Sequence, residues 1–304
     1  MTGYNRAVSR RLLPSLGVCL LALGVAVSAT QPSAPRQLRI IAFGAHPDDA
    51  ELKAAGVASL WAAQGHKVKF VSATNGDIGH FSQAGGPLAQ RRTKEVLECA
   101  RIMGITTDVL DIHDGELEPS LEYRRVFARK IRDWQADIVM GHRPYDYHPD
   151  HRYVGVLLND TAVVVGAAFF VPDTPPTQGN PIYLNYSDNF TDPKAFEPSV
   201  VVDIDAAADK KWSCVSAMSS QFGDADSWQG RTRPDVPKDD AKRPAYLLEL
   251  AKQRSAAVAD QYRAQLIARY GQDRGAKVKY AEAFQLNQYG RQVTMDALGQ
   301  MFPK

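Results

Sequence analysis

The sequence predicts an α/β protein with a mostly parallel sheet, and two observations support that class. Four short apolar runs, each typical of a buried strand, alternate with four helical patterns between residues 38 and 165. The residues suited to chemistry gather directly after the first and fourth runs, where the active sites of parallel sheets form. A chain of 304 residues is long enough for one large domain with a sizeable core.

The elements are expected in a regular order. Strands are predicted at 38–45, 67–74, 107–112 and 136–141, and helices at 50–64, 88–103, 119–134 and 148–165. Further on, strands are predicted at 181–186 and 199–204, and helices at 206–221 and 245–270. Between these last helices, the polar residues 222–243 predict a long loop, mobile or forming a lid. Residues 38–304 are therefore expected to form a single domain, in which 245–304 is a mainly helical C-terminal extension.

The charge balance argues against a nucleic-acid-binding protein. The chain has 36 Lys and Arg against 34 Asp and Glu, a formal charge of +2. Three of the basic residues lie in residues 1–29, which contain no acid, so the remainder is close to neutral. A nucleic-acid binder usually shows a clear basic excess.

The N-terminus has the layout of a secretory signal peptide. Basic residues 1–11 precede an apolar run at 12–29, which ends in small residues before Thr30. We predict a signal peptide at 1–29, a linker at 30–37, and export without a membrane span after cleavage. An uncleaved anchor is the alternative, because the run is just long enough to span a bilayer, although Pro14 disfavours it.

Two cysteines remain after the predicted cleavage, Cys99 and Cys214. Export permits a disulfide between them. Both lie in helical, partly apolar stretches, so we expect two separately buried thiols.

Two histidine-rich motifs indicate a metal site. The first, HPDDAE, follows the first strand and contains His46, Asp48 and Asp49. The second, HRPYDYHPDH, follows the fourth strand and contains His148 and His151 three residues apart. Two histidines and one carboxylate leave coordination positions open, which is typical of a catalytic zinc. Alternatively, each motif alone would serve to cap the helix that follows it.

The sequence resembles the LmbE/PIG-L family of zinc-dependent N-deacetylases. The resemblance rests on motifs in the family's order, with a further similarity at YAEAF (280–284). These motifs are AHPDDAE (45–51), TNGD (74–77), the pair Arg92 and Glu95, and HPDH (148–151). It implies a Rossmann-like three-layer αβα fold and removal of acetyl groups from N-acetylated sugars and related amines.

The resemblance also implies roles for individual residues. It implies one Zn²⁺ per chain held by His46, Asp49 and His151, with Asp48 as the general base. His148 would protonate the leaving amine or support the oxyanion, and Asp150 would orient His148. Glu51 would be a structural acid behind the ligands, and Arg92 would hold a polar group of the substrate.

Two more carboxylates are candidates on local grounds. Asp114 follows the third strand and is placed to bind sugar hydroxyls, although an ordinary Asp-Gly turn explains it equally well. Asp146 is placed to orient a neighbouring histidine ring, as carboxylates behind metal ligands do.

Together with these observations, the resemblance implies an exported zinc hydrolase that removes an acetyl group from an N-acetylated amino sugar or glycoconjugate. A zinc hydrolase of another amide or ester, and a sugar-binding protein without turnover, remain alternatives. The chain has no GxSxG nucleophile elbow, which argues against a serine hydrolase. It also has GAHPDD in place of GxGxxG after the first strand, which argues against a dinucleotide site.

Overall fold

A computed structural model describes residues 1–3 and 36–304 of the chain. The predicted signal peptide (1–29) beyond residue 3, and the predicted linker (30–37) up to residue 35, lie outside the described residues. Residues 37–304 form one compact unit. In the part of the chain that the structure describes, no helix is long and apolar enough to cross a membrane.

The described residues contain one seven-stranded sheet in the order β3-β2-β1-β4-β5-β7-β6. Its strands are β1 (Arg39–Gly44), β2 (Lys67–Ser72), β3 (Thr106–Val109), β4 (Ile138–Gly141), β5 (Ile182–Tyr186), β6 (Val200–Asp203) and β7 (Ala281–Gly290). Strands β1 to β5 pair in parallel, and β7 pairs antiparallel with both β5 and β6. The predicted α/β fold with a mostly parallel sheet is confirmed.

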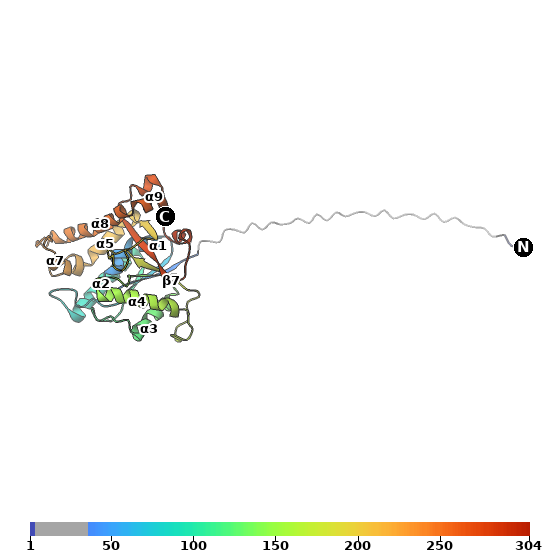
Figure 1. Cartoon of the computed structure of the whole chain (residues 1–304), viewed down its shortest axis with the longest axis horizontal. Coiled ribbons are helices and arrows are strands. Elements are labelled where there is room, and N and C mark those ends of the chain that lie inside the picture. Colours follow the sequence, from blue (N-terminus) through green and yellow to red (C-terminus); the bar gives the residue numbers. More distant parts are fainter. Residues whose placement is uncertain (4–35) are drawn as a thin grey trace. The chain divides into compact units, whose positions relative to one another are not determined.

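Helices cover both faces of this sheet. They are α1 (Asp49–Ala63), α2 (Gly85–Met103), α3 (Leu121–Trp134), α4 (Pro149–Val164), α5 (Ala208–Ala217), α6 (Ser219–Phe222), α7 (Trp228–Thr232), α8 (Arg243–Gln261), α9 (Arg263–Tyr270), α10 (Gln272–Gly275) and α11 (Met295–Met301). Alternate β1 residues face opposite layers, so Ile41 and Phe43 pack with α3 and α4 while Ile40 and Ala42 pack with α1, α2 and α5. Figure 1 shows α3 and α4 together, away from α5 and α8.

The C-terminal part differs from the expectation in four places. The helix expected at 206–221 is divided into α5 and α6 at Met218, and the one expected at 245–270 is divided into α8 and α9 at Tyr262. The expected loop at 222–243 contains the short helix α7. The part expected to be mainly helical also contributes the strand β7, whose sequence is AEAFQLNQYG. Its polar residues Glu282 and Asn287 are accommodated there because they hydrogen-bond to partners inside the protein.

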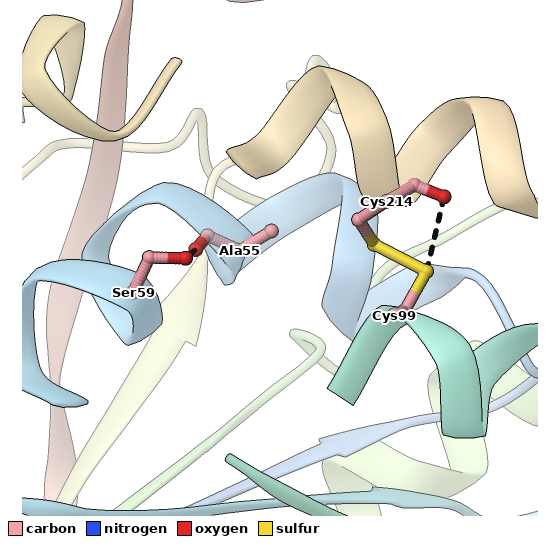
Figure 2. The surroundings of a disulfide bond; sticks show 4 residues. All are labelled: Ala55, Ser59, Cys99 and Cys214. Atoms are coloured by element: carbon pink, nitrogen blue, oxygen red, sulfur yellow. Dashed lines mark hydrogen bonds between the residues drawn. A yellow bond between two sulfur atoms is a disulfide. The ribbon is translucent and has the colours of Figure 1, made fainter. Parts of the chain in front are cut away.

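The two cysteines form a disulfide, so the expectation of separate thiols was wrong. Cys99 on α2 and Cys214 on α5 are both fully buried, with Cα atoms 4.4 Å apart. Figure 2 shows the bond between the two helices, beside α1. The disulfide therefore joins two helices of one layer that are 115 residues apart in sequence.

Candidate active site

The two histidine motifs meet at one edge of the sheet. Strand β1 lies between β2 and β4. The sheet therefore extends from β1 through β2 to β3 on one side and through β4 to β5 on the other. Ligands bind at such a switch point, outside the carboxyl ends of the strands. The turn after β1 carries His46 and Asp48, and α1 begins at Asp49. The segment after β4 carries His148, which is the N-cap of α4.

Three side chains bring possible ligand atoms to the spacing of a metal site. Nε2 of His151 lies 3.2 Å from Nδ1 of His46 and 3.3 Å from Oδ1 of Asp49. Nδ1 of His46 lies 3.4 Å from Oδ2 of Asp49. Zinc bonds of about 2.0–2.1 Å in tetrahedral geometry place ligand atoms about 3.3 Å apart. The two Asp49 distances run to different oxygens of its carboxylate, and at this spacing the three predicted ligands lie close enough to share a zinc-sized ion.

Carboxylates lie behind the two histidines. Nδ1 of His151 is 3.1 Å from Asp146, and Nε2 of His46 is 3.0 Å from Asp114 and 3.3 Å from Asp150. A carboxylate near one ring nitrogen fixes the ring and leaves the other nitrogen for the metal. Asp146 thus lies beside a histidine ring, as the sequence predicts. Asp114, which was considered for binding sugar hydroxyls, contacts the predicted ligand His46.

The electrostatics of the cluster favour a bound cation. Burial acts to raise the pKa of Asp49, but the charges of His151 and His142 hold it well below its usual range. Burial acts to lower the pKa of His46, but Asp114, Asp150 and Asp49 raise it well above 6.5. The pocket thus attracts positive charge to this point, and a metal ion would take the place of the imidazole proton.

Asp48 has a different environment from Asp49. It is half-buried and, within the described residues, its carboxylate accepts no hydrogen bond. Burial and the neighbouring charge of Asp49 raise the pKa of Asp48 to about 6. A carboxylate with a pKa near neutrality, beside a metal site, is suited to taking a proton.

His148 is held by the backbone of its own helix. Its Nδ1 accepts a hydrogen bond of 3.2 Å from the amide of Asp150, so its Nε2 carries the proton. The Asp150 carboxylate was expected to orient His148. Instead it accepts the Gly115 amide at 2.8 Å and lies against His46. The amide of Asp150, and not its carboxylate, orients His148.

The other predicted residues lie around this cluster. Arg92 is buried, donates to the carbonyl of Gly76 at 2.9 Å and lies 3.9 Å from Asp114. Glu51 is buried behind the ligands on α1, and burial raises its pKa to about 8. Arg92 lines the pocket and, through its hydrogen bond to Gly76, also supports the loop after β2.

Two supporting residues were missed in the sequence-based assignment of roles. His142, at the end of β4, stacks on His151 with ring centres 4.1 Å apart and lies 3.4 Å from Asp49. Asp77 accepts the amide of Asp114 at 3.1 Å and lies 2.6 Å from His113. Both residues follow predicted strands, and this position was the available signal in the sequence. It does not distinguish a residue that supports the site from one that lies at the protein surface.

A pocket of about 300 Å³ opens above the cluster. Its lining residues are His46, Asp48, Asp49, Leu52, Ile78, Gly79, Arg92, Asp114, Tyr147, His148, His151, Gln221, Trp228, Gln229 and Arg254. Ile78, Trp228 and Tyr147 are 52%, 55% and 70% exposed at its rim. Trp228 belongs to α7, in the predicted loop, and stacks on Phe81 with ring centres 5.6 Å apart. The pocket is therefore acidic at its base and partly aromatic at its mouth.

Comparisons with known proteins point to one family. A model of the PIG-L family, described as GlcNAc-PI de-N-acetylase, matches residues 41–162. The diacetylchitobiose deacetylase of Thermococcus kodakarensis is 27% identical over 202 residues, which are 63% of this chain and 72% of that one. The 4-oxalmesaconate hydratase of Pseudomonas putida is 23% identical over 195 residues, 61% of this chain and 74% of that one.

A solved structure shows the same fold. The N,N'-diacetylchitobiose deacetylase from Pyrococcus horikoshii superposes with a TM-score of 0.63 at 23% identity, covering 82% of this chain and 83% of that one. The matched family segment contains both histidine motifs, from β1 to α4.

Proposed function

This chain carries a PIG-L family domain, and on that premise we propose that it is a zinc-dependent deacetylase of an N-acetylated amino sugar or glycoconjugate. The spacing of 3.2–3.4 Å between the donor atoms of His46, Asp49 and His151 carries the proposal. The unpaired carboxylate of Asp48 beside them supports hydrolysis rather than metal storage. The relation to diacetylchitobiose deacetylase favours an amino sugar as the substrate.

The roles of the side chains follow from their contacts. A divalent ion held by His46, Asp49 and His151 would supply a Lewis acid that polarises water and the amide carbonyl. Asp48 takes the proton of the attacking water and passes it to the amide nitrogen as the C–N bond breaks. His148 donates from Nε2 to the carbonyl oxygen as negative charge develops there. The products are acetate and a free amine.

Export is part of the proposal. It rests on the signal-like residues 1–29, and the disulfide between Cys99 and Cys214 supports it. Disulfides persist in oxidising compartments and are rare in reducing ones.

The test is acetate release by the full chain from a panel of N-acetylated mono- and disaccharides. Each substrate is assayed after treatment with a chelator and again after Zn²⁺ is returned. We expect acetate and free amine in equal amounts, lost with the chelator and restored by zinc. Metal-independent release, or no release from any amide by the zinc-loaded protein, would overturn the proposal. Release from an ester but not from an amide would assign a different hydrolase.

A further inference from the structure

Gln221 is a buried wall residue of the candidate pocket whose side chain has no hydrogen-bond partner. It belongs to α6, lines the pocket and is 5% exposed. Its Nε2 is enclosed, and neither atom of its amide forms a hydrogen bond with any described residue. Buried polar side chains in native proteins are nearly always paired, so an unpaired one needs an explanation.

The backbone that carries Gln221 is held in place by other contacts. Ser220 is fully buried, and its amide and hydroxyl donate to the carboxylate of Glu95 at 2.9 and 2.6 Å. The backbone amide of Gln221 donates to the carbonyl oxygen of Met218 at 3.0 Å. These contacts fix where the side chain enters the pocket, while the last torsion angle of the glutamine leaves its amide group free to turn.

The unpaired amide lowers the stability of the substrate-free protein. An enclosed amide that has given up water without gaining a partner carries a desolvation cost. A methionine of similar length would fill the same space without that cost. The chain thus keeps a polar group that its own fold does not use, which is expected where the partner arrives with the substrate.

The position of Gln221 in the pocket indicates the chemistry of that partner. In the proposed reaction, the metal site, Asp48 and His148 act on the acetamide. The remainder of the sugar carries hydroxyl groups and lies against other parts of the wall, to which Gln221 belongs. A hydroxyl both donates and accepts a hydrogen bond, so it can pair with either atom of the amide.

We propose that Gln221 is a specificity-determining residue, which hydrogen-bonds a hydroxyl group of the acetylated sugar. The inference rests on the proposed deacetylase function for the orientation of that sugar. An analogue that lacks this hydroxyl would leave the buried amide unpaired, and sites built in this way discriminate strongly against such analogues. The substrate must therefore carry this hydroxyl free, and not substituted by another sugar or an acyl group.

The experiment uses N-acetylglucosamine and its 3-deoxy, 4-deoxy and 6-deoxy analogues with the zinc-loaded full chain. We expect one of the three analogues to lose about tenfold in kcat/KM, as for one hydrogen bond to a buried group. Gln221→Met should lower kcat/KM for N-acetylglucosamine by a similar factor. The variant should then use this analogue and N-acetylglucosamine equally well, because the hydroxyl has lost its partner.

Stability measurements separate recognition from a structural role. Gln221→Met should melt at the temperature of the wild type or above it, because it removes an enclosed amide without a partner. Gln221→Leu, a second apolar replacement, should behave in the same way. Gln265→Met is the matched control: Gln265 is an exposed residue of α9 outside this pocket, so kcat/KM should not change. A lower melting temperature of the Gln221 variants, with equal losses on all four sugars, would overturn the inference.

Calorimetry with the same four sugars separates this inference from the proposed function. If no acetate is released, but one analogue binds more weakly than N-acetylglucosamine and Gln221→Met removes that difference, the hydroxyl contact stands and the deacetylase proposal fails. If acetate is released and no analogue differs from N-acetylglucosamine through Gln221, the contact is wrong and the deacetylase proposal stands. Absence of both release and binding with all four sugars would also overturn the inference.

Discussion

The two halves of the domain contribute differently to the candidate site. The segment from β1 to α4 provides the candidate metal ligands, the base and the residues behind them. The segment after β5 provides part of the wall, with Gln221, Trp228, Gln229 and Arg254. The first half therefore holds the candidate chemical groups, and the second half completes the wall around them.

The two halves also differ in what the sequence reveals. A motif after a parallel strand lies at a predictable edge of the sheet, so its position follows from local pattern. A wall residue such as Arg254 reaches the pocket only through packing of a distant helix. This difference explains why the reaction is easier to infer than the substrate.

The second half also holds the first in place. Glu282 of β7 accepts the amides of Gly56 and Val57 at 2.9 and 2.8 Å, in the middle of α1. Nζ of Lys211 on α5 donates to Glu282 at 2.7 Å and to the carbonyl of Leu52 at 2.9 Å. Because α1 carries Asp48 at its N-cap, this buried pair fixes the helix that presents the candidate base.

A further set of contacts ties α2 to the pocket wall. Glu95 accepts hydrogen bonds from the amide and hydroxyl of Ser220 and from the hydroxyl of Ser219. Arg91 donates to Asp224 at 2.5 Å. The two serines precede Gln221, so these contacts position a wall residue against the first half of the domain.

The largest effect is expected in the first half, at the base. Asp48→Asn should lower kcat about 10³-fold, because the amide cannot take a proton and general-base catalysis contributes about 10²–10⁴. Acetate release measures the effect, with bound zinc and the melting temperature as controls. Activity near that of the wild type with unchanged zinc content would refute the assignment of the base.

The next effect tests whether the second half anchors α1. Glu282→Gln should destabilise the protein by about 3–5 kcal/mol, because Lys211 is 4% exposed and would remain buried without its anion. Urea unfolding at pH 7 measures the change. Combining Lys211→Met with Glu282→Leu should cost less than the two single changes together. Additive costs would show that the pair does not act as a unit.

The disulfide links the two halves covalently and should have a smaller effect. Replacing both Cys99 and Cys214 by Ala should cost about 2–4 kcal/mol, because the bond closes a long loop in the unfolded chain. A reductant should lower the free energy of unfolding of the wild type by a similar amount, which is seen as a lower unfolding midpoint. An unchanged midpoint under reductant would argue against the cross-link. We expect kcat to be retained, since the bond lies outside the pocket lining.

The smallest effect is expected at the wall. Trp228→Ala should raise KM about tenfold with little change in kcat. Contact with one face of the indole ring would bury about 50 Å² of apolar surface, which is worth roughly 1.3 kcal/mol. Phe81→Ala, which removes the ring that stacks on Trp228, should have a weaker effect in the same direction. A fall in kcat alone would place Trp228 in the chemistry and weaken the distinction between the halves.

Much of the first half could be predicted from the sequence. The expected strand at 38–45 and helix at 50–64 match β1 and α1 within one residue at every end, because apolar periodicity and small residues mark both. His46, Asp49 and His151 do come together in the structure, since their strands are adjacent in the sheet. The contacts of Asp150 were not predictable, because spacing in sequence does not show which ring a carboxylate faces.

The second half was less predictable for physical reasons. Strand β7 was missed because Glu282 interrupts its apolar pattern, and a buried ion pair leaves no local signal. The disulfide was missed because the faces that α2 and α5 turn toward each other depend on how the two helices pack. Arg254 was not identified as a site residue, because only the folded chain brings α8 beside Tyr147.

The place of β7 in the sheet also bears on how the protein is made. Synthesis proceeds from the N-terminus, and β6 has no described sheet partner other than β7, which is translated long after it. The motifs with the candidate catalytic groups leave the ribosome first, whereas the strand that holds α1 follows only from Ala281 onward. A nascent chain stopped before residue 281 would contain both histidine motifs of the candidate site but lack the strand that holds α1 in place.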